Sequence, residues 1–188
     1  MDSDIPAEGG DKSLNRAVAA TVVLLSVFLG VCNIKDGNIN QAMQQAKADA
    51  VDTWGEYQAT RTKLHISQGS ADQLAVLGAL ASDKSAVAGQ QADLTAEIAK
   101  YQRETPALQA KAKGFEAQYD ALNFHDDQFD ATDALVSIGI SVAAVAALVE
   151  SFWVLAVGWV FGAFGVLLGV AGFAGWAIHP DFLARWLS

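Results

Sequence analysis

The chain has 188 residues, 52% of them hydrophobic and 18% charged, and its formal net charge at pH 7 is −9. So large an apolar share is not that of an ordinary soluble domain. Most of the negative charge lies in residues 36–133, which hold 8 basic and 15 acidic side chains, so nucleic acid and anionic lipid head groups are poor partners for that region.

The apolar residues form two blocks, 17–34 and 134–178, and the second is interrupted only by Glu150. Because a transmembrane helix needs about 20 apolar residues, the blocks predict one span followed by two. We therefore predict an all-α membrane protein with three transmembrane helices. The predicted parts are a flexible tail at 1–15, a first transmembrane helix at 16–35, an extramembrane helical hairpin at 36–133, two transmembrane helices within 134–178 and a short C-terminal tail at 179–188.

Between the blocks, apolar residues recur in steps of three and four over two stretches, which is the pattern of helices that pack on one another. This pattern predicts a long antiparallel coiled-coil hairpin between the first and second transmembrane helices. Turns are predicted at 36–38 and within 82–89, and Pro106 is predicted to kink the second helix or to restart it with Thr105 as its cap. The first seam comprises Ile39, Met43, Ala46, Ala50, Trp54, Tyr57, Arg61 and Leu64, and the second comprises Leu94, Ile98, Tyr101, Thr105, Leu108, Ala112, Phe115, Tyr119, Leu122, Asp126 and Phe129.

The last apolar block carries a stripe of glycines spaced four, three, four and three residues apart, all on one side of a helix. In lipid such a stripe lets another backbone approach closely, so it is a candidate helix-packing or partner interface. Tryptophans near the predicted interfaces serve as aromatic anchors. The glycines are Gly158, Gly162, Gly165, Gly169 and Gly172, and the anchors are Trp153, Trp159, Trp176 and Trp186.

A second candidate interface lies on the hairpin. Trp54, Tyr57 and Gln58 fall within little more than one helical turn, and they form either a recognition patch or, as we favour, two large residues in the core of a helical pair. Phe115 and Tyr119 lie on the returning helix. Two antiparallel helices leave such apolar positions partly uncovered, which predicts further helices from an oligomer or a larger complex.

No catalytic constellation is found in the sequence. His125 with Asp126 and Asp127 could supply half of a metal site, with His65 as a further ligand, but solvated polar residues near a membrane are the favoured reading. Glu150 is read as an interfacial acid in a turn rather than as a proton relay. We expect no enzyme activity, no cofactor and no metal.

The membrane orientation is predicted from basic residues beside the first span. Lys12 and Arg16 lie in a short segment, which favours a cytoplasmic N-terminus and a periplasmic hairpin, although Lys35 on the other side opposes this orientation. The expected location is the bacterial inner membrane, with multiple passes and membrane lipid as a partner.

One stretch resembles a known family. Residues 54–59 read Trp-Gly-Glu-Tyr-Gln-Ala, which is similar to the W-x-x-Y-Q-A signature of the bacterial DUF4337 membrane proteins. The segments at 101–104, 110–112 and 125–129 also resemble that family's pattern, in the same order. The family's basic residues are missing from the turn at 150–153. The resemblance implies fold and membrane placement only.

Two functions from different classes remain open. The first is a non-enzymatic membrane scaffold or accessory subunit that assembles with itself or with a larger complex through the hairpin and the glycine stripe. The alternative is an ion-conducting or proton-driven motor subunit, against which the absence of polar residues between Val154 and Ala177 argues.

Overall fold

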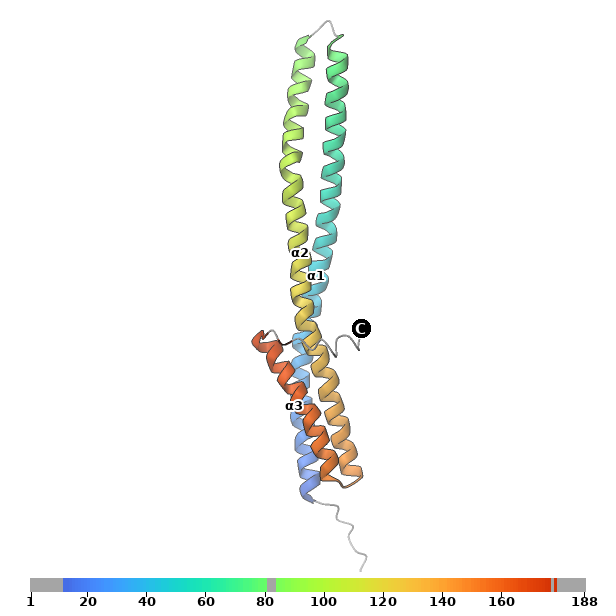
Figure 1. The fold of residues 1–188 in the computed structure, drawn as a ribbon, viewed down its shortest axis with the longest axis vertical. Helices are drawn as coiled ribbons and strands as arrows, with labels where there is room; N and C mark the ends of the chain where they lie inside the picture. The colour runs from blue at the N-terminus through green and yellow to red at the C-terminus, as the bar shows by residue number, and fades with distance from the viewer. Residues whose placement is uncertain (1–11, 81–83, 177, 179–188) are drawn as a thin grey trace, which may run out of the picture. The chain divides into compact units, whose positions relative to one another are not determined.

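A computed structural model describes residues 12–80, 84–176 and 178 of the chain. These residues form α1 (Lys12–Gly78), α2 (Lys84–Leu148) and α3 (Phe152–Ala174), and the described part contains no strand (Figure 1). Each helix includes a stretch long and apolar enough to span a membrane. Most of the predicted N-terminal tail, the predicted C-terminal tail and Trp186 lie outside the described residues.

The first helix is longer at both ends than predicted. It begins at Lys12, with Leu14 only 1% exposed, so the last residues of the predicted tail are helical. It also runs without interruption through 36–38, where a turn was predicted wrongly. A glycine inside a helix costs only about 1 kcal/mol, which the packing of the rest of α1 can offset, and Asn40 Nδ2 donates to Asp36 Oδ2 at 3.4 Å across that turn of helix.

The second helix passes through Pro106. The predicted restart with Thr105 as a cap is therefore wrong, because the Thr105 hydroxyl donates back to the Tyr101 carbonyl at 2.7 Å, as it does inside a helix. The helix begins at Lys84, so residues 84–89 of the segment in which a turn was predicted are helical. The second connection agrees with the prediction: α2 ends at Leu148, and Glu150 has a φ of 50° just before α3.

The chain divides into two compact units, and each is described by itself. Unit 1 comprises residues 1–41 and 121–188, and unit 2 comprises residues 42–120. The segment 36–133, predicted as an extramembrane hairpin, extends past unit 2 at both ends, since residues 36–41 and 121–133 belong to unit 1.

Unit 2 is an antiparallel pair formed by parts of α1 and α2 (Figure 1). The pairing is fixed by hydrogen bonds from Ser67 Oγ to Glu97 Oε2 (3.1 Å) and from Trp54 Nε1 to Glu116 Oε1 (2.9 Å). The predicted seam on α2 is half-buried or buried throughout, with Ala112 fully enclosed. On α1 the seam differs from the prediction after Ala50. The buried positions are Thr53, Thr60 and Ser67, whereas Trp54 is half-buried and Arg61 is exposed.

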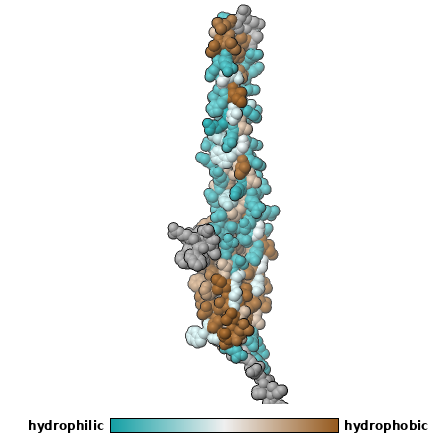
Figure 2. All heavy atoms as spheres, turned by 90° about the vertical axis from the view of Figure 1, so that its right-hand side faces the viewer, coloured by the Kyte–Doolittle hydropathy of each residue, from teal (hydrophilic) through white to brown (hydrophobic). Residues whose placement is uncertain are grey.

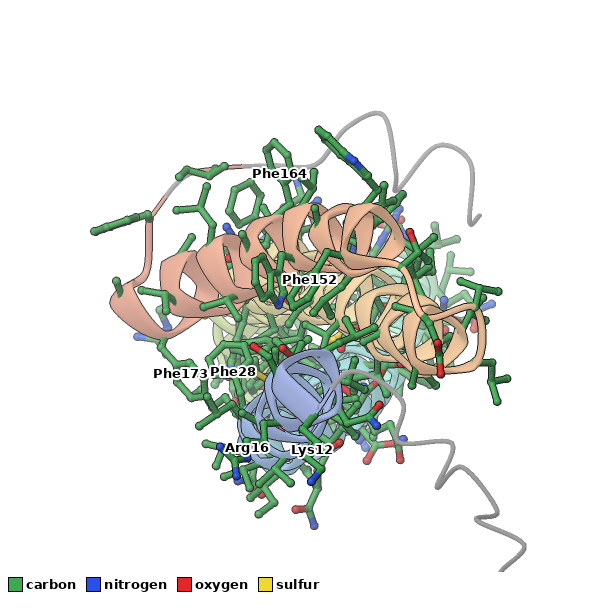
Figure 3. The ribbon with its side chains drawn as sticks, turned by 90° about the horizontal axis from the view of Figure 1, so that it is seen from below. Lys12, Arg16, Phe28, Phe152, Phe164 and Phe173 are labelled. Carbon is green, nitrogen blue, oxygen red and sulfur yellow. The ribbon has the colours of Figure 1, made fainter. Side chains whose placement is uncertain are left out.

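Unit 1 is a three-helix bundle. Its core joins Leu14 and Val18 of α1, Ala143 and Ala146 of α2, and Leu155 of α3. Figure 3 shows Lys12 and Arg16 directed away from α3, and Phe164 on the face of α3 that is turned away from α1. On the face shown in Figure 2, apolar residues gather on the outside of this unit, whereas unit 2 is more polar. The exposed apolar residues of unit 2 include Val76, Leu77 and Leu80 at the end of the helical pair.

Candidate functional site

All five glycines of the predicted stripe are buried, and they face α1 and α2 of the same chain. At Gly158, α3 meets the backbone of α2 directly. A Cβ built on Gly158 would lie 3.0 Å from the carbonyl oxygen of Gly139, and a Cβ built on Gly139 would lie 3.0 Å from the nitrogen of Gly162. A side chain larger than hydrogen would therefore separate α3 from α2.

The other glycines of the stripe are covered by side chains. Gly162 faces Leu25, Gly165 faces Val136, Gly169 faces Phe28 and Thr132, and Gly172 faces the ring of Phe129, each at a separation that leaves no room for a methyl group. The Phe129 ring also packs edge to face on Phe173, with ring centroids 5.2 Å apart. The glycine surface is thus occupied within one chain, so a second molecule would have to bind elsewhere.

A hydrogen bond adds to this packing between α1 and α3. Trp159 Nε1 donates to Thr21 Oγ1 at 2.8 Å, and the Thr21 hydroxyl donates in turn to the Ala17 carbonyl at 2.8 Å. Trp159, predicted as an interfacial anchor, links α3 to α1 through this hydrogen bond.

The aromatic residues predicted in the hairpin come together in unit 2. Trp54 and Tyr57 pack edge to face, with centroids 5.2 Å apart, and the Arg61 guanidinium lies 5.7 Å from the Tyr57 ring centroid. Gln58 is exposed, whereas Phe115 and Tyr119 on α2 are half-buried.

A groove of about 280 Å³ brings Trp54 and Tyr119 into one surface feature. Val51, 64% exposed, lies at its edge, and Lys47, Ala50, Glu116 and Asp120 complete the lining. The groove combines an apolar floor with charges of both signs. Such a surface suits contact with another protein, because aromatic residues with hydrogen-bonding atoms contribute strongly to protein interfaces.

Sequence reasoning missed a polar layer between α1 and α2 in unit 1. Asn40 Nδ2 donates to Asp126 Oδ1 at 2.9 Å and to Asp36 Oδ2 at 3.4 Å, so one amide joins two carboxyl groups from different helices. Burial, and then the charges of Asp36 and Asp130, raise the pKa of Asp126 to about 7. Burial likewise raises the pKa of Asp130.

Next to this layer, Gln128 is fully buried. Its Nε2 donates to the carbonyl oxygens of Trp176 (2.9 Å) and Ile178 (2.6 Å), and its Oε1 lies 3.0 Å from His125 Nδ1. Gln128 therefore holds the backbone that follows α3. This helix ends in a left-handed cap at Gly175, whose φ is 66°.

The predicted half of a metal site has a different arrangement. In the described part of the chain, no three His, Cys, Asp or Glu side chains gather as a metal ion would need. His125 is oriented by Gln128, and Asp126 by Asn40.

The family model described as "Domain of unknown function (DUF4337)" matches residues 14–175. Searches of the curated proteins and of the solved structures each gave no match. The match covers well over half of the chain and both units, so the chain belongs to the DUF4337 family.

Proposed function

We propose that this DUF4337 protein is a non-enzymatic scaffold or accessory subunit of the bacterial inner membrane. In this proposal, the helices of unit 1 anchor the chain in lipid. Unit 2 is an extramembrane coiled-coil hairpin that binds a second copy or a larger membrane complex. Neither role requires a cofactor, a metal or nucleic acid.

The distribution of exposed apolar side chains supports the assignment of unit 1 as the anchor. In unit 1 they occur along all of its helices, where lipid is a suitable solvent for them. Examples are Val23, Leu24 and Val27 on α1, Val145 and Leu148 on α2, and Val160, Phe164 and Leu167 on α3.

The observation that carries the binding role is the groove beside Trp54 and Tyr119. It places two aromatic side chains and the exposed Val51 beside charged residues of unit 2. Because the glycine stripe is already covered by α1 and α2, the proposal assigns the intermolecular contact to unit 2 rather than to α3.

Photocrosslinking in native membranes tests this role. A photoreactive residue in place of Trp54 or Phe115 should capture one defined species, either a second copy or another membrane protein. The same probe in place of Gln102, an exposed residue of α2 in unit 2, is the matched control and should capture much less of that species. Equal capture from all positions, or none from Trp54 and Phe115, would refute the binding role.

A cysteine-accessibility experiment tests the proposed orientation. Cys32 is the one cysteine of the chain and is buried, so its replacement by Ala gives a cysteine-free background. Starting from this background, we expect Gln58→Cys to react with a membrane-impermeant maleimide in intact spheroplasts, because the proposal puts unit 2 in the periplasm. Labelling only after lysis would reverse the orientation and leave the scaffold role standing.

The alternative is an ion-conducting or proton-driven motor subunit. No ionisable side chain occurs between Phe152 and Ala174, so α3 offers no group to carry a proton across the membrane. Proton flux into liposomes that contain the purified protein separates the two functions, because a scaffold should not raise the flux above that of protein-free liposomes.

A further inference from the structure

The polar layer between α1 and α2 contains an acceptor without a donor. Asp36 Oδ1 is buried, and no group in the described part of the protein donates a hydrogen bond to it. Asn40 supplies its amide to Asp36 Oδ2 and to Asp126 Oδ1. One oxygen of each carboxyl group is left. Because Asn40 Nδ2 lies 3.4 Å from Asp36 Oδ2 and 2.9 Å from Asp126 Oδ1, the two carboxyl groups are neighbours, and a hydrogen bond between them would use both remaining oxygens.

Two ionised carboxylates cannot form that bond, because both are acceptors only. A single proton resolves the conflict: the protonated carboxyl donates, and the other carboxylate accepts. A buried acceptor that lacks a donor costs free energy, and so does a pair of like charges in a partly desolvated site. Both costs disappear when one proton is bound.

The surrounding charges favour the state in which the pair of carboxyl groups holds one proton. On α1 the neighbouring charged residue is Lys35, which is exposed, and on α2 the neighbours are His125, Asp127, Asp130 and Asp133. Among described residues no Lys, Arg or His forms an ion pair with Asp36 or Asp126, and α3 has no ionisable side chain. Neither Asp36 nor Asp126 therefore has a partner cation among the described residues.

We propose that Asp36 and Asp126 form a proton-binding pair that fastens α1 to α2 through an acid–carboxylate hydrogen bond and loosens when the proton leaves. Asn40 orients both groups by donating to each of them. The pair lies in unit 1, in the part of each helix that comes nearest in sequence to unit 2. This inference concerns regulation of helix packing and does not depend on the proposed scaffold role.

The direction of the pH effect follows from the pKa of Asp126, which is raised from 3.8 to about 7 in the folded protein. Between these values the folded state holds a proton that the unfolded state has released. The free energy of unfolding is therefore highest below pH 3.8. It falls as the pH rises towards about 7 and does not change further at higher pH. An uncharged donor at position 126 should abolish this dependence.

The test compares the full-length protein with Asp126→Asn in detergent micelles. The wild-type midpoint of thermal unfolding should fall by several degrees between about pH 5 and about pH 8, whereas that of Asp126→Asn should fall much less and should exceed the wild-type midpoint at the higher pH. Infrared spectra should show a protonated carboxyl band in the wild type at the lower pH that is smaller at the higher pH and in the variant.

Two further variants keep the test decisive. Asp36→Asn should behave like Asp126→Asn, because an amide at either position donates to the remaining carboxylate, and it serves as the test if Asp126→Asn does not fold. Asp133→Asn removes an exposed carboxylate of α2 outside the pair and should follow the wild type. The proposal is overturned if Asp126→Asn and Asp36→Asn retain the wild-type pH dependence, or if Asp133→Asn abolishes it equally.

Discussion

Gly158 of α3 and Gly139 of α2 pack backbone against backbone: a methyl group on the α-carbon of Gly158 would lie 3.0 Å from the carbonyl oxygen of Gly139. It would also lie 3.3 Å from the amide nitrogen of Ala143. Neither atom belongs to a side chain that can rotate away, so the contact accepts no residue larger than glycine without a shift of a whole helix.

Gly158→Ala should therefore destabilise unit 1 by about 1–3 kcal/mol, the usual cost of overpacking. Equilibrium unfolding in mixed micelles measures the change. Gly30→Ala is the matched control, since nothing lies within 4 Å of the added methyl group, and it should be neutral or stabilising by up to about 1 kcal/mol because alanine favours helix. Similar losses in both variants would contradict the backbone contact.

The hydrogen bond from Trp159 to Thr21 should make a smaller contribution. Trp159→Phe keeps most of the apolar surface but removes the donor, so a loss of about 0.6 kcal/mol is expected, the average for hydrogen bonds between membrane helices, and at most about 1.7 kcal/mol. Trp153→Phe is the control at a tryptophan that is 85% exposed. If both substitutions cost the same, the effect comes from the indole ring rather than from the bond.

Gln128 should contribute more to stability than the Trp159–Thr21 hydrogen bond does, because both of its amide hydrogens are used in a fully buried site. Gln128→Met has nearly the same shape but no donor and should cost about 1–3 kcal/mol by leaving two backbone carbonyls without that partner. It should also increase proteolysis after Gly175. Gln58→Met, at an exposed position of unit 2, should change neither unfolding nor cleavage.

Among the residues that the structure describes, Glu150 is the one non-glycine residue with a positive φ, which is 50°. The left-handed conformation costs a residue with a Cβ roughly 1–2 kcal/mol relative to glycine, so Glu150→Gly should stabilise the connection between α2 and α3 by about 1 kcal/mol. The neighbouring Ser151 has a φ of −123°, so Ser151→Gly should bring no such gain. Unfolding measurements on the two variants decide the matter, and a loss in Glu150→Gly would contradict the assignment of strain.

Much of the helical pattern could be predicted from the sequence. The seam from Leu94 to Phe129 is apolar enough to be followed, and the structure buries or half-buries all of it. On α1 the predicted Tyr57 and Leu64 are half-buried. The buried Thr53, Thr60 and Ser67 were missed, because the pattern was traced through apolar residues and these three carry hydroxyl groups. Glycine and proline disfavour helix, so interruptions were predicted at Gly37 and Pro106, but both residues lie inside continuous helices.

The glycine contacts and the polar layer were harder to predict from the sequence, because each depends on which helices pack against each other. A glycine stripe indicates close packing but does not say whether the partner is another molecule, and here the residues that cover it come from α1 and α2. The Asp36–Asn40–Asp126 layer joins two helices, with Asn40 and Asp126 86 positions apart, so no local motif marks it. Counting outward from the connection between α1 and α2 would have placed these residues opposite one another.

Gln128 also has a consequence for biosynthesis. The carbonyl groups that it holds belong to residues 48 and 50 positions later, so they leave the ribosome well after Gln128 does. The end of the last helix can be secured only when the second helix is already in place. Packing of unit 1 is thus completed from its C-terminal end, and a chain that stops before Trp176 would leave a buried amide with no acceptor for its hydrogens.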